Sequence, residues 1–155
     1  MKNRGFTLIE TIIYIALFAI LMSGAVVAAY NLFEGSDRNE SAILIQEEGT
    51  FLNRKINWAL AGASAAQSSN GGTTLTVTRP DLAYDVVITG NGATMTIARG
   101  GGDPLGLNSD RFPVESPASG PMFAVQPASD GRPPSVTTSF VIRGKPFVFR
   151  TYVRQ

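Results

Sequence analysis

The sequence contains neither cysteine nor histidine, and these two absences limit its chemistry. Without cysteine there is no disulfide framework and no thiol nucleophile, and without histidine there is no Ser-His triad and no imidazole metal ligand. Charged residues are also few, at 16% of 155 residues. Most hydrolase and zinc chemistries are therefore excluded. The length allows one domain of ordinary size plus an extra helix.

Apolar residues are concentrated near the N-terminus. Residues 11–29 form a run of 19 residues without a charge, and with residues 6–10, which include Glu10, the mostly apolar stretch is 24 residues long. As a helix rising about 1.5 Å per residue, the stretch measures about 36 Å, enough to cross a hydrocarbon core of about 30 Å. A water-soluble domain rarely contains a helix that is apolar on every side. We therefore expect a membrane-inserted N-terminus.

The charges on either side of this run predict its orientation. Lys2 and Arg4 precede the run, whereas the chain from Tyr30 onward carries 11 basic and 11 acidic residues. By the positive-inside rule, the N-terminus stays in the cytoplasm and the C-terminal part lies outside the inner membrane. A neutral exported part does not favour a general nucleic-acid binder, which needs a basic surface.

The acidic residue Glu10 distinguishes this N-terminus from an ordinary signal peptide or anchor. A secretory signal is one alternative, because Val27, Ala28 and Ala29 are small residues that a signal peptidase accepts; a plain single-pass anchor is another. Neither needs a carboxylate, which costs about 2.5–3.5 kcal/mol at the centre of a membrane helix and less near its end. The simplest explanation is that Glu10 interacts favourably with the helix dipole. An intramembrane acid otherwise indicates a function and needs a partner.

The hexapeptide Gly5-Phe6-Thr7-Leu8-Ile9-Glu10 resembles the processing site of type IV pilins and type II secretion pseudopilins. The resemblance covers the short basic leader, the Gly-Phe junction, the acid four residues after the Phe, and the apolar run. It implies that a membrane aspartic peptidase, the prepilin peptidase, cuts between Gly5 and Phe6 and methylates the new amine of Phe6. It also implies that Glu10 is the glutamate needed for assembly.

A physical reason for such a glutamate follows from the cleavage. Removal of residues 1–5 leaves an ammonium group on Phe6 beside the lipid. In a bundle of such helices, this ammonium and the Glu10 carboxylate of a neighbour neutralise each other, which offsets much of the cost of burying either charge alone. The pair would set the axial register between subunits.

The sequence as a whole predicts an α+β fold. We expect a leader at residues 1–5, the membrane and assembly half of a helix at 6–30, a soluble helical segment at 31–66 and an antiparallel sheet domain at 73–155. Residues 31–40 are polar and indicate a frayed or bent helix, and the resemblance to pilins implies one long helix packed on the sheet. The apolar face of the soluble segment comprises Ile45, Leu52, Ile56 and Leu60. Along the whole helical region the weak points are Gly24, Gly35 and Gly49.

Alternation of apolar and polar residues predicts the strands. The apolar face of the sheet needs cover, which the helix over residues 41–66 supplies. Asn91 and Gly92 form a hairpin turn. The segments that alternate are 74–79, 82–89 and 94–97. The C-terminal part supplies further expected strands at 122–126, 136–143 and 146–154, with a short one at 111–115.

Three further features have ordinary and functional explanations. In the long connection over residues 99–121, Asp103, Asn108 and Asp110 could bind calcium, but their spacing is not that of an EF-hand, and solvated loop acids are the ordinary explanation. Trp58 is expected to be a core or interface anchor rather than part of a ligand site.

The third feature is the basic C-terminal strand, where Arg150, Tyr152 and Arg154 share a face opposite Phe147, Phe149 and Val153. This face could contact DNA, as in competence pilins, or an acidic partner. Residues 34–48 carry five acids and one arginine, so a complementary contact between neighbouring subunits is equally available. The ordinary explanation is an edge strand protected from aggregation by its charge.

These features predict a structural subunit, a minor pilin or pseudopilin of a type IV pilus or a type II secretion pseudopilus. Its expected partners are other pilins, the prepilin peptidase, an inner-membrane assembly platform and the membrane, with DNA as an open possibility. It would reside in the inner membrane and then in a filament, the periplasm or the cell surface. The alternatives are a DNA-uptake pilin, or an anchored or secreted binding module.

We expect no enzyme activity, cofactor or metal. The candidate acids for catalysis show no convincing arrangement for acid–base work: Asp81, Asp85, Glu115 and Asp130.

The mature protein is expected to begin at Phe6 and to carry a methyl group on its amine. Mass spectrometry of the native N-terminus measures this directly. A start at Tyr30 would indicate signal peptidase, and a start at Met1 would indicate an uncut anchor. Either result would contradict the pilin interpretation.

Overall fold

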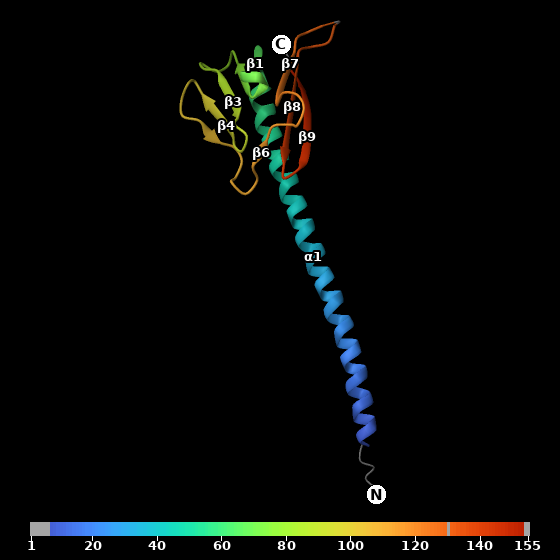
Figure 1. The fold of residues 1–155 in the computed structure, drawn as a ribbon. Coiled ribbons are helices and arrows are strands. Elements are labelled where there is room, and N and C mark those ends of the chain that lie inside the picture. The colour runs from blue at the N-terminus through green and yellow to red at the C-terminus, as the bar shows by residue number, and fades with distance from the viewer. Residues whose placement is uncertain (1–6, 130, 154–155) are drawn as a thin grey trace. The chain divides into compact units, whose positions relative to one another are not determined.

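The computed structural model describes residues 7–129 and 131–153. One long N-terminal helix is followed by antiparallel strands, so the architecture is α+β and pilin-like, as the sequence predicts (Figure 1). The chain divides into two units, residues up to Ile43 and Leu44–Gln155. The elements in chain order are α1 (Leu8–Leu60), β1 (Ala65–Ser69), η1 (Asn70–Gly72), β2 (Thr74–Thr78), β3 (Val86–Gly90), β4 (Met95–Arg99), β5 (Leu105–Gly106), β6 (Val114–Glu115), β7 (Phe123–Gln126), β8 (Ser135–Ile142) and β9 (Lys145–Tyr152).

Helix α1 begins at a side-chain cap. The backbone N–H of Glu10 donates to Thr7 Oγ1 over 3.4 Å, and the Thr-x-x-Glu spacing is that of a capping box. Residues 31–40 were expected to be frayed or bent, but they are regular helix. An ion pair between Glu34 and Arg38, one turn apart, supports the helix there.

The helix ends earlier than the predicted boundary at residue 66. Its last residue is Leu60, and Gly62 has a φ of 76°. Glycine adopts this left-handed conformation without steric cost, and such a residue commonly terminates a helix. The residues that follow are therefore free to enter the sheet as β1.

The first sheet has the order β1-β2-β3-β4-β5. Strands β2, β3 and β4 confirm the predicted alternation, and Ile88 lies between Leu75 and Ile97 on neighbouring strands. Strand β3 starts at Val86 rather than at Leu82, because Leu82 N–H donates to the Arg79 carbonyl in a turn (3.2 Å). Strand β1 is not predicted by its small polar residues; it pairs along its whole length with β2.

The remaining strands form a second sheet instead of extending the first. Strand β8 pairs with β9 along all eight residues, and β7 and β6 share the other edge of β8. The two sheets meet at β1 and β7, where the Ser68 hydroxyl donates to the Phe123 carbonyl over 2.8 Å.

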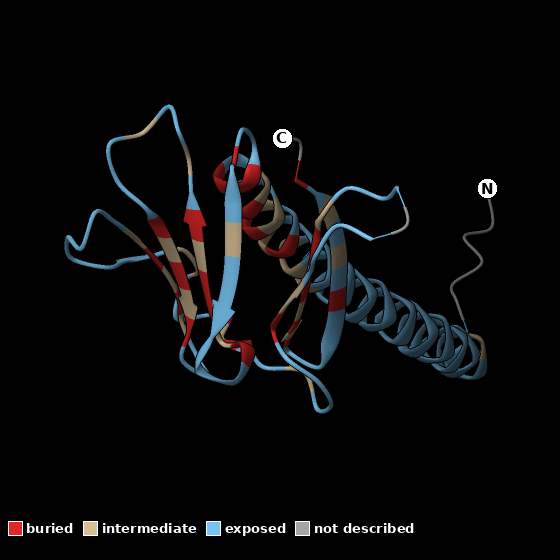
Figure 2. Cartoon of the chain, turned by 90° about the horizontal axis from the view of Figure 1, so that it is seen from above, coloured by how far each residue is buried: buried red, intermediate tan, exposed pale blue. Residues whose placement is uncertain are grey.

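Both sheets of the second unit pack around the C-terminal turns of α1 (Figures 1 and 2). The helix contributes apolar side chains one and two turns apart, as its predicted face requires. Buried residues occur on strands of both sheets and on the last turns of α1 (Figure 2). The fully buried members of the core include Leu52, Ala59, Leu60, Leu75, Val77, Val86, Ile88, Met95, Met122, Phe123, Phe140 and Ile142.

Gly49 allows close contact between α1 and the second sheet. A Cβ atom at this position would lie 2.3 Å from Cε1 of Phe147. The Phe147 ring also stacks on Phe140, with ring centroids 5.4 Å apart, so it has little freedom to retreat. The helix-weakening glycine thus makes room for an aromatic side chain of the core.

We expect Gly49→Ala to lower the free energy of unfolding of the second unit. Overpacking against Phe147 costs about 1–3 kcal/mol, which outweighs the gain of about 1 kcal/mol that alanine brings to a helix. The measurement is urea unfolding of the detergent-solubilised full chain, followed by the fluorescence of its one tryptophan, Trp58.

Gly35→Ala is the matched control, because a Cβ atom at Gly35 meets nothing within 4 Å. This variant should leave the unfolding of the second unit unchanged or slightly favour the folded state. Equal behaviour of the two alanine variants would contradict the packing role of Gly49.

Candidate functional site

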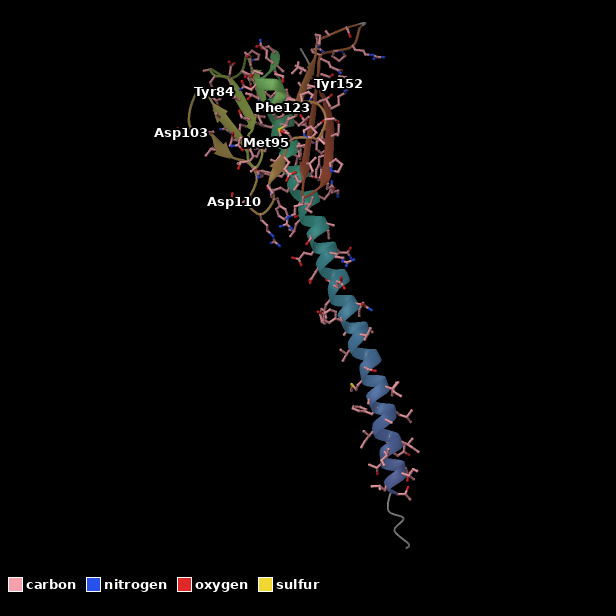
Figure 3. The ribbon with its side chains drawn as sticks, viewed as in Figure 1. Tyr84, Met95, Asp103, Asp110, Phe123 and Tyr152 are labelled. Carbon is pink, nitrogen blue, oxygen red and sulfur yellow. The ribbon has the colours of Figure 1, made fainter. Side chains whose placement is uncertain are left out.

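The first unit exposes an almost continuous apolar surface. An 18-residue window of α1 has a mean hydropathy of 2.5, and none of its residues is buried. Ile9 is 69% exposed and Leu21 is 72% exposed. Apolar side chains surround the helix instead of forming one stripe (Figure 3). Such a surface needs cover from lipid or from other helices.

Glu10 lies in the first turn of α1, at the start of this surface. Its side chain is half-buried, and Oε1 accepts a hydrogen bond from the Tyr14 hydroxyl over 3.3 Å. The acid and the tyrosine are four residues apart, which places them on one helix face. Glu10 is therefore an acid at one end of an apolar helix, and it is hydrogen-bonded to Tyr14 on the same helix face.

Two residues that contribute to this site were not predicted from the sequence. Thr7 supplies the helix cap, and Tyr14 supplies the hydrogen bond to the acid. The Thr-x-x-Glu spacing and the i,i+4 spacing of Glu10 and Tyr14 were the available signals. The predicted processing residues Gly5 and Phe6 lie outside the described residues, as does the leader.

The connection over residues 99–121 is held by Asn108. Its Oδ1 accepts from Met95 N–H over 2.7 Å, and its Nδ2 donates to the carbonyls of Ala93 and Phe112 at 3.0 Å each. Glu48 on α1 accepts from Ser109 N–H at 2.9 Å. This segment is therefore fastened to both the sheet and the helix.

The structure does not assemble the calcium site considered for this connection. Asn108 uses its amide to hold backbone groups, and Asp103 and Asp110 lie at separate exposed places (Figure 3). Within residues 7–129 and 131–153, no three His, Cys, Asp or Glu side chains come together to hold a metal ion. The ordinary explanation of solvated loop acids fits both aspartates.

The acids considered for catalysis have different surroundings. Asp81 accepts two hydrogen bonds from the guanidinium of Arg79, which lower the pKa of Asp81 and keep it charged. Asp85 is exposed between β2 and β3, and Glu115 is exposed in β6. Asp130 lies outside the described residues.

Trp58 lines an open groove instead of being enclosed in the core. Its side chain is 40% exposed, and the guanidinium groups of Arg79 and Arg99 lie 5.4 and 5.1 Å from the ring centroid. The groove has a volume of about 810 Å³. We call it the Trp58 groove; its walls include Phe51, Arg54, Lys55, Trp58, Arg99 and Leu105.

The basic C-terminal strand alternates as predicted. Phe147 and Val153 are buried, whereas Tyr152 is 52% exposed (Figure 3). Arg150 donates to Gln126 Oε1 over 3.3 Å and to Thr137 Oγ1 over 3.4 Å, so its guanidinium lies along the outer face of the second sheet. Arg154 lies outside the described part of the chain, and a role of this face in DNA binding stays a prediction.

We expect Asn108→Ala to lower the free energy of unfolding by about 1–3 kcal/mol, because it leaves the Met95 N–H without its acceptor. Asp110→Ala, at an exposed position of the same connection, is the control and should change little. Calcium and a chelator should leave the unfolding midpoint of the natural chain unchanged. A calcium-dependent rise in the midpoint that Asp110→Ala abolishes would contradict this account.

Comparison with protein families identifies a known motif in the N-terminal segment. Residues 1–26 match the family described as the prokaryotic N-terminal methylation motif. Comparison with curated proteins and with solved structures gave no match. The matched segment contains Gly5, Phe6 and Glu10 and runs into the exposed apolar helix. The motif and the α+β architecture together are consistent with the pilin and pseudopilin family.

Proposed function

We propose that this chain is a non-catalytic structural subunit, a minor pilin or pseudopilin, of a type IV pilus or type II secretion pseudopilus. The observation that carries the proposal is Glu10, an acid in the first turn of a helix whose following turns expose apolar side chains on every side. The N-terminal methylation motif, matched over residues 1–26, includes the first turns of this helix. A subunit that must leave lipid and enter a helix bundle needs both features.

The proposed sequence of events begins in the inner membrane. Prepilin peptidase removes residues 1–5 on the cytoplasmic side and methylates the amine of Phe6. The apolar part of α1 then holds the subunit in the bilayer, with the second unit outside, until the assembly platform extracts it. In the filament the same surface is buried against other pilins, which recovers about 25 cal/mol for each Å² of apolar surface kept from water.

Glu10 has two tasks in this proposal. Its carboxylate neutralises the Phe6 ammonium of a neighbouring subunit, so neither charge remains alone in an apolar bundle. The Tyr14 hydroxyl, already bonded to Oε1, orients the carboxylate from its own helix. Because apolar contacts alone permit sliding along the axis, this directional pair sets the register.

We expect Glu10→Ala to block entry into the filament without preventing membrane insertion, because the alanine removes the partner of the ammonium and leaves the helix more apolar. Sheared filaments and membrane fractions from producing cells are compared by immunoblot. Glu40→Ala, an exposed acid of the same helix beyond the apolar run, is the control and should assemble normally. Normal filament entry of Glu10→Ala would refute the proposed role.

A further inference from the structure

The Trp58 groove combines apolar walls with unpaired positive charge. Phe51, Trp58 and Leu105 supply exposed or half-exposed apolar surface, with Leu105 67% exposed. Lys55 lies over the Phe51 ring at 5.5 Å, and Arg99 lies over Trp58. No acidic side chain is among the described residues that line it.

The cations of the groove lack acidic partners within the described ranges. Arg79, beside the groove, is matched by Asp81, and the other ion pair of the described chain joins Glu34 and Arg38. Arg54, Lys55 and Arg99 take part in neither pair. A surface with three cations around exposed aromatic rings fits an occupant that carries both carboxylates and apolar side chains.

The first unit presents a surface of that composition on α1. Tyr30, Phe33, Glu34 and Asp37 follow one another at helical spacing and line one shallow hollow. Tyr30 and Phe33 are each 73% exposed. These residues share one helix face because they lie three, four and seven positions from Tyr30. We call this face the acidic stripe.

We propose that the Trp58 groove of one subunit receives the acidic stripe of a second copy of this chain. The inference rests on the proposed function, because it describes how two subunits meet in a filament. The stripe places aromatic rings against Phe51 and Trp58 and the Asp37 carboxylate beside Arg54, Lys55 and Arg99, whereas Glu34 is already paired with Arg38 on its own helix.

The two surfaces differ from each other, and this difference determines the kind of assembly. A subunit that offers a groove to one neighbour and a stripe to another forms a head-to-tail contact. Such contacts repeat into a helical fibre unless the rotation closes a ring. The proposed contact therefore adds a filament-forming interface outside the membrane to the one made by the apolar helix.

The absence of cysteine makes site-directed cross-linking a direct test. Ser41→Cys extends the stripe by one turn, and Gly106→Cys lies in the groove, where a Cβ atom meets only Thr94 at 3.9 Å. The two full-length variants are mixed in detergent micelles and oxidised, and the disulfide-linked heterodimer is quantified on gels. Ser36→Cys, which lies on another face of the same helix, replaces Ser41→Cys as the control.

We expect about fivefold more heterodimer from Ser41→Cys than from Ser36→Cys, the effect of one or two close charge pairs. Asp37→Lys on the stripe copy should remove this excess, and Arg54→Glu on the groove copy should restore it. Equal yields from the two cysteines, or no restoration by the second charge reversal, would overturn the proposal.

A nucleic acid is the competing occupant, and Trp58 reports on it. If a single-stranded oligonucleotide quenches the Trp58 fluorescence, Arg54→Glu abolishes the quenching, and the cross-link is absent, the groove binds nucleic acid and the proposal is wrong. Failure of the proposed function is separately visible: a mature N-terminus other than Phe6 refutes the filament subunit itself, whereas a failed cross-link with Phe6 at the N-terminus refutes only this contact.

Discussion

Apolar side chains that the first unit does not cover impose the main constraint on this protein. Between Leu8 and Val27 the helix exposes large apolar groups, among them Leu8 at 82% and Leu21 at 72%. Each Å² of such surface left in water costs about 25 cal/mol, so the helix requires lipid or other helices at every stage. The proposed function gives it lipid first and neighbouring subunits afterwards. Glu10 matters because it is the one charged residue between Leu8 and Val27, at the start of this apolar surface.

The second unit solves a different packing problem with the same helix. Here α1 buries only one face, through residues such as Leu52, Ile56 and Leu60, and two sheets close around it. Gly49 lets the Phe147 ring approach the helix backbone, and Asn108 fastens the irregular connection to the first sheet. Charged residues around Trp58 are left outside this core, and the proposed contact between subunits uses them.

Much of the secondary structure was accessible from local patterns. The strands β3, β4 and β9 follow the predicted alternation most clearly, because one side of each strand is more buried than the other. The helix face through Leu52 and Ile56 follows the 3.6-residue period. Strand β1 could not be predicted in this way, because its small polar residues carry no alternation and its pairing with β2 defines it. The Thr7 cap was not predicted, although the Thr-x-x-Glu spacing is a local signal for it.

The amino-acid sequence by itself determined the N-terminal methylation motif, the membrane-length helix and the presence of an acid in it, because these depend on composition and order over short stretches. Only the tertiary structure decided that the strands divide into two sheets and that Gly49 makes room for Phe147. It also decided that Asn108 binds the backbone carbonyls of Ala93 and Phe112, and that Trp58 borders an open basic groove. Each of these depends on contacts between residues far apart in the chain. Local periodicity carries no information about which distant surfaces meet.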